Sequence, residues 1–347
     1  MDIQRIVMTG PREVEVAREV VAEDALSPHE VVLRTQYSLI SPGTELAHFA
    51  GNADLGWHIP EQPYPWFPGY AAVGVVLAAG GEAGVRVGET VLAHTGHQSA
   101  ARFDARRRVC VPIPDGVPPH RATMGRLGQV SAVALRVCAA RAGDWAAVIG
   151  LGLVGACAAQ LLRAAGLSVV GVDPLPERRA LATRYGVARA IDPRDVASVD
   201  AAVEASGGGC RLALECSGQA RGVETALALA ARHGQVALVG AAWRRDTEVL
   251  ATDIMRPIFD KFLTLRSGWE WQIPLYGDDA DDSVAACTRW VLSCIADGRL
   301  DAQALITDMI APSGAAEAYR QLLDEPAAHL GVVVDWTGAT PGAWGTS

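Results

Sequence analysis

The sequence predicts an α/β protein with a β-rich part and a doubly wound parallel sheet. Up to about residue 118, short apolar runs at 31–39, 73–77 and 85–92 alternate with Gly- and Pro-containing turns, a pattern typical of strands. From about residue 121, strands and helices alternate, which requires a parallel sheet covered by helices on both faces. A chain of 347 residues that is 50% hydrophobic has enough material for two cores.

The elements of the second part follow from apolar runs and helical periodicity. Four buried strands are expected at 145–149, 168–172, 212–215 and 235–239. Helices are expected between them, at 121–143, 154–165, 177–186 and 220–232. Two more amphipathic helices at 283–297 and 313–324 and a closing strand, GVVVDW, complete the chain.

Composition excludes several classes of function. The net charge of -9, with Lys261 as the one lysine, disfavours nucleic-acid binding and rules out a P-loop. No apolar run is long enough to span a membrane, and the charged N-terminus does not read as a signal peptide, so we expect a cytoplasmic protein without a membrane partner. The seven cysteines never form a CxxC pair and are expected to be reduced, buried thiols.

The motif Gly150-Leu151-Gly152-Leu153-Val154-Gly155 predicts a dinucleotide site. It follows an apolar strand and opens an apolar helix, as the Rossmann arrangement requires. Gly150 permits the turn, Gly152 admits the pyrophosphate and Gly155 lets helix and strand pack closely. The helix that begins at Leu153 and Val154 points its free N–H groups at the phosphates.

Asp173 ends the next strand and predicts a preference for NAD over NADP. A carboxylate there accepts hydrogen bonds from both ribose hydroxyls and repels a 2′-phosphate. Arg178 follows closely, and it either lines the adenine edge or tolerates the extra phosphate. Ser217, Val239 and Gly240 lie at later strand ends, which open onto the crevice where the nicotinamide is expected.

Three blocks, ISPGTE at 40–45, YPWFPGY at 64–70 and ALITD at 304–308, together with the glycine motif, resemble the medium-chain dehydrogenase/reductase superfamily. The first two resemble the subgroup of bacteriochlorophyllide hydroxyethyl dehydrogenases. The resemblance implies a GroES-like catalytic domain made of residues 1–122 and 273–347. It also implies an inserted Rossmann NAD-binding domain at 123–272 and a homodimer joined near Trp269 and Trp271.

The residues that hold catalytic zinc in this superfamily are missing. The ligand cysteine is replaced by Pro42 and the ligand histidine by Tyr70. The third ligand is expected within 124–128, where MGRLG offers no Cys, Asp, Glu or His. Zinc catalysis requires three protein ligands and an open position. The resemblance therefore implies a zinc-independent member, with a site built from His94, His97 and a carboxylate as the remaining alternative.

Without zinc, a side chain must exchange the proton of the reacting oxygen. Thr44 matches the superfamily's relay hydroxyl, and Tyr70 is the leading acid–base candidate, although it is equally a candidate for simple packing. His94 and His97 align with the segment that lines the substrate channel, and an imidazole titrates near neutrality.

Aromatic residues around Trp57 and Trp66 favour a wide pocket for a bulky or ring-shaped substrate, or else core packing. We expect an NAD-dependent oxidoreductase that interconverts a secondary alcohol and a ketone on a small molecule. The expected substrate class is a natural-product, sugar or cyclitol intermediate of a biosynthetic pathway. The alternatives are an enone or quinone reductase that uses NAD(P)H, and a non-catalytic NAD(H)-binding protein.

Overall fold

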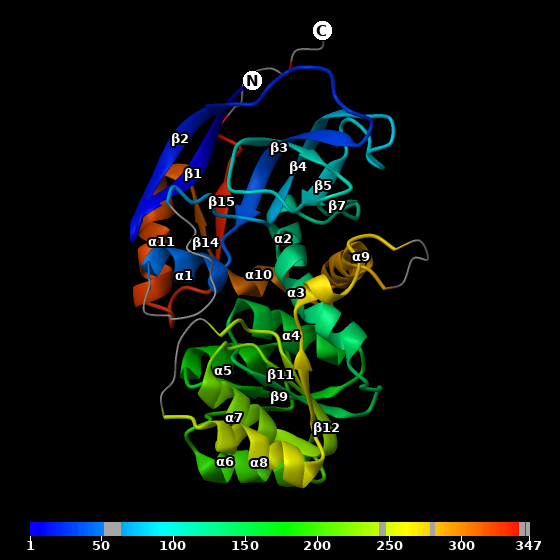
Figure 1. Ribbon diagram of the computed structural model, residues 1–347, viewed down its shortest axis with the longest axis vertical. Coiled ribbons are helices and arrows are strands. Elements are labelled where there is room, and N and C mark those ends of the chain that lie inside the picture. The colour runs from blue at the N-terminus through cyan, green and yellow to red at the C-terminus, as the bar shows by residue number, and fades with distance from the viewer. Residues whose placement is uncertain (52–63, 243–247, 278–281, 340–343, 345–347) are drawn as a thin grey trace.

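The computed structural model describes the whole chain except residues 52–63, 243–247, 278–281, 340–343 and 345–347. The protein has two lobes, each built around its own sheet (Figure 1). The upper lobe in that view contains both ends of the chain, and the lower lobe contains the middle of the chain, coloured green to yellow. The α/β fold class expected from the sequence is confirmed.

The upper lobe contains an antiparallel hairpin, β1 (Asp2–Gly10) with β2 (Glu13–Val20), and a seven-stranded sheet. The sheet order is β14-β15-β3-β4-β5-β7, and β6 pairs with β3. Its strands are β3 (Glu30–Leu39), β4 (Ala72–Ala79), β5 (Thr90–Ala93), β6 (Ala100–Asp104), β7 (Cys110–Pro112), β14 (Ile306–Ile310) and β15 (Gly331–Asp335). Because β15 pairs with β3, the C-terminal segment returns to the N-terminal sheet.

The lower lobe is built on a six-stranded parallel sheet in the order β10-β9-β8-β11-β12-β13, the strand order of a doubly wound nucleotide-binding fold. Its strands are β8 (Trp145–Ile149), β9 (Ser168–Val172), β10 (Arg189–Ile191), β11 (Cys210–Glu215), β12 (Ala230–Leu238) and β13 (Thr264–Ser267). The helices that connect them are α4 (Leu153–Ala164), α5 (Pro176–Arg184), α6 (Val196–Ala205), α7 (Ala220–Leu229) and α8 (Ala251–Lys261).

The expected strands 145–149 and 168–172 are confirmed to the residue, while other boundaries differ. The helix expected at 220–232 ends at Leu229, because Ala230 already pairs with Cys210 in the sheet. The strand expected at 85–92 begins only at Thr90, the first residue of β5, because Gly88 forms a turn with a φ of 86°.

The remaining helices lie in the upper lobe or at the junction of the two lobes. They are α1 (Thr44–Ala50), α2 (Pro119–Ala122), α3 (Met124–Val137), α9 (Val284–Ala296), α10 (Ala302–Leu305) and α11 (Ala315–Asp324). One apolar cluster contains Leu39 and Val333 from the antiparallel sheet together with Leu127 of α3, Leu153 of α4 and Val291 of α9. The junction is therefore a shared core. No helix among the described residues is both long enough and apolar enough to cross a membrane.

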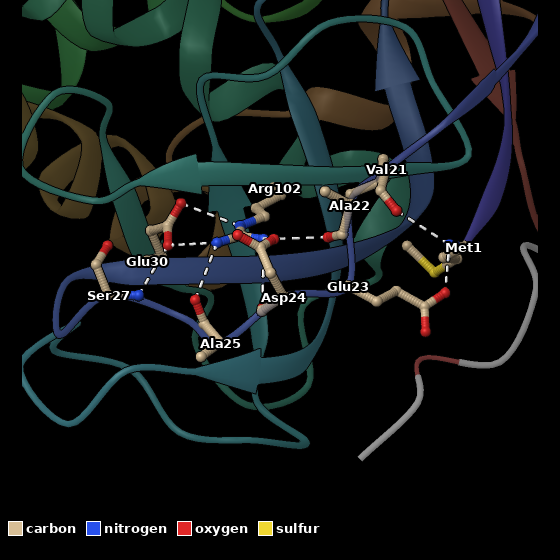
Figure 2. Close-up of polar contacts among 9 residues, drawn as sticks. All are labelled: Met1, Val21, Ala22, Glu23, Asp24, Ala25, Ser27, Glu30 and Arg102. Carbon is tan, nitrogen blue, oxygen red and sulfur yellow. Dashed lines mark hydrogen bonds and ion pairs between the residues drawn. The ribbon is translucent and has the colours of Figure 1, made fainter. Parts of the chain in front are cut away.

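Arg102 on β6 fastens the loop that leads into β3 (Figure 2). Its guanidinium donates to both carboxylate oxygens of Glu30, at 3.0 and 2.8 Å, to the carbonyl of Ala22 at 3.1 Å and to the carboxylate of Asp24. The hydrogen bond from Arg102 is the main reason that the pKa of Glu30 falls to about 2.

We expect Glu30→Gln to lower the free energy of unfolding by about 1 kcal/mol at pH 7. A carboxylate whose pKa is depressed in the folded state stabilises the fold above its unfolded pKa, near 4.5, and loses this effect as the pH falls toward 2. Urea unfolding should therefore show a difference between wild type and variant that shrinks between pH 5 and pH 2. Glu317→Gln, which removes an exposed pair with Arg320, should have little effect at either pH.

Candidate active site

A cleft of about 400 Å³ lies between the lobes. Its upper wall comes from the turn before α1 and from α1 itself, and its lower wall comes from the ends of parallel strands. The segment that follows α11 closes one side. Residues from both walls line the cleft, among them Pro42, Gly43, Gly152, Arg178 and Ser217.

The three glycines of the first loop have different roles. Gly150 has a φ of 86°, and a Cβ there would lie 2.8 Å from the backbone nitrogen of Ser217. At Gly155 a Cβ would lie 1.8 Å from the carbonyl oxygen of Gly150, so no side chain fits. At Gly152, by contrast, a Cβ would meet nothing closer than the Arg178 guanidinium, at 3.2 Å. Gly152 therefore leaves space in the cleft rather than in the protein core.

The start of α4 suits an anion. Gly152 is the N-cap of α4 and has no side chain that could cap the free N–H groups of the first turn. Gly150, Gly152, Leu153 and Val154 all line the cleft. The unpaired N–H groups and the positive end of the helix dipole are available to a pyrophosphate.

Asp173 lies behind this loop and is 3% exposed. One carboxylate oxygen accepts from the backbone N–H of Leu151 at 2.8 Å, and the other accepts from that of Leu175 at 2.9 Å. Asp173 thus holds the glycine loop in place, which the sequence did not reveal. Each carboxylate oxygen can accept a further hydrogen bond, so its expected role toward a ribose is compatible with these contacts.

The Arg178 side chain lies beside the glycine loop and lines the cleft. Its guanidinium lies 3.9 Å from the Asp173 carboxylate and donates to the carbonyl of Pro326 at 3.0 Å. Its Nε is buried and has no partner among the described residues. Arg178 therefore connects the nucleotide loop to the segment after α11 and presents a positive charge to the cleft.

The second loop is organised by Glu215, at the end of β11. Its carboxylate accepts from the backbone N–H of Ser217 at 2.8 Å and of Gly218 at 3.0 Å, and from the Ser217 hydroxyl. Burial raises the pKa of Glu215, and these hydrogen bonds oppose that shift. Ser217 lines the cleft as expected. Val239 and Gly240 do not line it; their N–H groups donate to the Glu215 carbonyl and so support the loop from behind.

Tyr70 meets the residues that precede α1. Its hydroxyl donates to Oγ of Ser41 and lies close to the hydroxyl of Thr44, the first residue of α1. Pro42 and Gly43, between these two hydroxyl residues, line the cleft. Burial raises the pKa of Tyr70 above its usual value. The phenol is therefore protonated at neutral pH and can donate a hydrogen bond or a proton.

A buried arginine on α3 lies against the ring of Tyr70, a contact that the sequence did not predict. The Arg126 guanidinium carbon lies 4.6 Å from the ring centre, and the residue is 3% exposed. One terminal nitrogen donates to Glu270 at 2.8 Å and the other donates to Gln129 at 2.8 Å. The available signal was a charged residue within the mainly apolar, buried stretch 124–134.

The two candidate histidines occupy different environments. His97 is fully buried, and both of its nitrogens are engaged, by Ser38 at 2.8 Å and by Glu45 at 3.0 Å. This placement does not suit the acid–base role expected for His97, because neither nitrogen is free. His94 is 7% exposed and its Nε2 has no partner among the described residues, so it stays a candidate. Burial lowers the pKa of His94 well below its usual value.

The aromatic pocket expected from the sequence is only partly described. Trp57 lies outside the described residues. Trp66 stacks on His48 with ring centres 3.9 Å apart and is not among the residues that line the cleft. Its packing against a core cluster with Met8 and Phe49 matches the alternative interpretation, core packing.

At the three positions where ligands were expected, the described side chains do not fit a zinc ion. In the part of the chain that the structure describes, no three His, Cys, Asp or Glu side chains gather closely enough to hold a metal. The positions expected for ligands bring together Tyr70, Arg126 and the turn at Pro42. A guanidinium beside a phenol repels a cation instead of binding it.

Comparisons with known proteins agree with this architecture. Residues 154–269 match the family described as zinc-binding dehydrogenase. The chain is 29% identical to 2-desacetyl-2-hydroxyethyl bacteriochlorophyllide A dehydrogenase of Cereibacter sphaeroides, over 95% of this chain and 97% of that protein. These similarities support the resemblance to the medium-chain dehydrogenase/reductase superfamily.

Two solved structures have the same fold at low sequence identity. Galactitol-1-phosphate dehydrogenase from Escherichia coli superposes with a TM-score of 0.80 at 19% identity, covering 96% of this chain and 99% of that one. A protein described as a short chain alcohol dehydrogenase from E. coli, complexed with the cofactor NADH, superposes with a TM-score of 0.74 at 18% identity and the same coverage.

We predict opposite outcomes for two glycine substitutions in the first loop. Gly152→Ala should weaken NADH binding by about tenfold or more, because the new methyl group enters the space needed by the pyrophosphate, while the melting temperature stays unchanged. Gly155→Ala should lower the melting temperature, because its methyl group overlaps the Gly150 carbonyl. Fluorescence titration and thermal unfolding separate the two effects. Equal loss of stability in both variants would contradict the roles assigned here.

Asp173→Ser should weaken NADH binding and relax the preference against NADPH, because the carboxylate that repels a 2′-phosphate is removed. The measurement is the ratio of the two dissociation constants. Asp192→Ser, which removes a carboxylate that pairs with Arg179 and Arg194 outside the cleft, is the matched control and should leave that ratio unchanged. A ratio for Asp173→Ser equal to that of wild type would exclude cofactor selection by this residue.

Proposed function

We propose that this oxidoreductase interconverts a secondary alcohol and a ketone on a bulky small molecule, with NAD(H) and without zinc. One observation carries the proposal. The dinucleotide cleft is bounded by Pro42 and Gly43, and the flanking hydroxyls of Ser41 and Thr44 both contact the phenol of Tyr70. A proton-donating group thus adjoins the place where a hydride donor would bind.

The chemistry requires a proton and a hydride at adjacent atoms. NAD(H), when bound, supplies or accepts the hydride. Tyr70 is protonated at neutral pH and donates to the carbonyl oxygen as negative charge develops there. In the oxidation direction the same phenol must first lose its proton. Ser41 and Thr44 hold the phenolic oxygen in position in both directions.

NAD is the preferred cofactor in this proposal. Asp173 supports it, because a buried carboxylate behind the glycine loop disfavours the 2′-phosphate of NADP. Arg178 in the cleft can pair with the pyrophosphate.

A bulky substrate is supported by the relatives. The similar protein from C. sphaeroides is named as a dehydrogenase of a hydroxyethyl bacteriochlorophyllide. We therefore propose a cyclic natural-product, sugar or cyclitol intermediate as substrate.

We also propose that the protein forms a homodimer through the end of the parallel sheet. Strand β13 is an edge strand, with the exposed side chains of Trp269 and Trp271 directly after it. On the neighbouring helix α8, Met255 and Phe259 are 65% and 78% exposed. An unpaired edge beside exposed apolar side chains favours association with a second copy.

Tyr70→Phe should lower kcat by more than tenfold while leaving NADH affinity unchanged, because the phenolic hydroxyl is removed and the ring is kept. Tyr185→Phe is the matched control, because the Tyr185 hydroxyl is buried without a partner in the described part of the chain. Its kcat should equal that of wild type. Full activity in Tyr70→Phe would eliminate the phenol as the acid–base group.

Turnover of a panel of alcohols, ketones and enones, combined with metal analysis, tests the proposal against its alternatives. We expect activity on alcohols and ketones that survives a chelator, in protein without stoichiometric zinc. Reduction of enones alone would indicate an enone or quinone reductase. Binding of NADH without turnover of any compound would favour a non-catalytic NAD(H)-binding protein.

A further inference from the structure

The buried ion pair between Arg126 and Glu270 has no explanation in the fold alone. Arg126 is 3% exposed and Glu270 is 6% exposed. Removing two charges from water costs several kcal/mol per ion, and an apolar pair of similar volume is often at least as stable. A pair that is retained in spite of this penalty calls for a function at its location.

The Arg126–Glu270 ion pair lies next to Tyr70, the candidate acid–base group. The Arg126 guanidinium lies over the face of the Tyr70 ring, 4.6 Å from its centre, and the phenolic oxygen of that ring contacts Ser41 and Thr44. The resemblance implies three positions for zinc ligands. Tyr70 occupies one of them, and Arg126 lies within the segment 124–128, where another is expected. The chain therefore has a fixed cation where its zinc-dependent relatives are expected to hold a metal.

The polar atoms around Arg126 are incompletely paired. Its own Nε, Nε2 of Gln129 and Nε2 of His94 are all buried and have no partner among the described residues. The first two are donors, and His94 is influenced electrostatically by Arg126. Unpaired buried donors cost free energy, so their concentration in one place indicates that the site is built to face negative charge.

We propose that Arg126 is a positioning residue that takes over the electrostatic role of the missing zinc, by stabilising the anionic form of Tyr70 during proton transfer. This inference rests on the proposed function. Glu270 and Gln129 hold the guanidinium in place from two sides. Glu270 belongs to a short 3-10 helix (Glu270–Gln272) after β13, whereas Tyr70 directly precedes β4, so the two lobes meet at this cation.

The proton transfer balances as follows in ketone reduction. The carbonyl carbon gains hydride from NADH, the π electrons move to the oxygen, and this oxygen takes the proton of Tyr70 as the phenolic O–H bond breaks. The phenolate that remains lies against the Arg126 guanidinium until a proton from water restores it. Oxidation of the alcohol with NAD⁺ follows the reverse order and starts from the phenolate.

The groups that act on Tyr70 oppose one another. Burial is the largest influence and raises its pKa, and the carboxylate of Glu45 also raises it. Arg126 is the largest opposing influence, and contacts with Ser41 and Thr44 act in the same direction as Arg126. Because Arg126 is the one cation in this set, its removal should leave the phenol substantially harder to ionise.

The test compares wild type with Arg126→Lys, Arg126→Gln and the double variant Arg126→Gln/Glu270→Gln. The double variant removes the whole ion pair, so it does not leave Glu270 as an unpaired buried charge. Tyrosine ionisation is followed by ultraviolet difference titration against Tyr70→Phe, in protein without cofactor. The pH profile of kcat for alcohol oxidation is measured in parallel.

We expect the apparent pKa of Tyr70 to rise by about one unit or more in both glutamine variants, while Arg126→Lys retains part of the wild-type value. The kcat for oxidation at pH 8 should fall by about tenfold in these variants, with NADH affinity unchanged. Arg136→Gln removes another α3 arginine, which pairs with the carboxylate of Asp282 at 3.8 Å. This variant is the control and should change neither quantity.

An unchanged Tyr70 titration in the double variant, with kcat lowered or not, would overturn the role of Arg126. The proposed function would survive that result, provided that Tyr70→Phe is impaired. Full activity in Tyr70→Phe would instead defeat the proposed proton donor itself, and with it the inference. The two failures are therefore distinguishable.

Discussion

The buried carboxylate of Glu45 is the interaction on which the site depends. It accepts hydrogen bonds from the backbone N–H of Ser41 at 3.0 Å, from the His97 ring at 3.0 Å and from the Tyr319 hydroxyl. Ser38 in turn contacts His97 and accepts from the indole of Trp336. This network connects the start of α1 to β3, to α11 and to the C-terminal strand, so the turn that holds Tyr70 and borders the cleft has little freedom to move.

Buried carboxylates that accept several hydrogen bonds also organise the lower wall of the cleft. Asp173 and Glu215 are both buried carboxylates at the ends of parallel strands, and each accepts hydrogen bonds from backbone N–H groups of a loop. In both cases an acidic side chain satisfies N–H groups that would otherwise be unpaired in the interior. The loops are therefore rigid before any ligand binds, which lowers the entropy lost on cofactor binding.

Charge is distributed unevenly around the junction of the lobes. Acidic residues shape the loops, whereas Arg126 and Arg178 supply the positive charge, beside Tyr70 and in the cleft respectively. An anionic cofactor and an oxygen that gains negative charge both benefit from this arrangement. The low exposure of Arg126 strengthens its interactions, because little water surrounds a buried side chain.

The sequence by itself determined the fold class, four of the six parallel strands, the glycine loop with Asp173 and the absence of zinc ligands at their expected positions. These features depend on local patterns, namely apolar periodicity and motif spacing. Only the tertiary structure decided that Tyr70 lies against Arg126, that His97 is occupied by Glu45, and that Val239 and Gly240 support the second loop from behind. Each of these contacts joins residues far apart in the chain. Packing of the two lobes brings them together, and no local pattern encodes it.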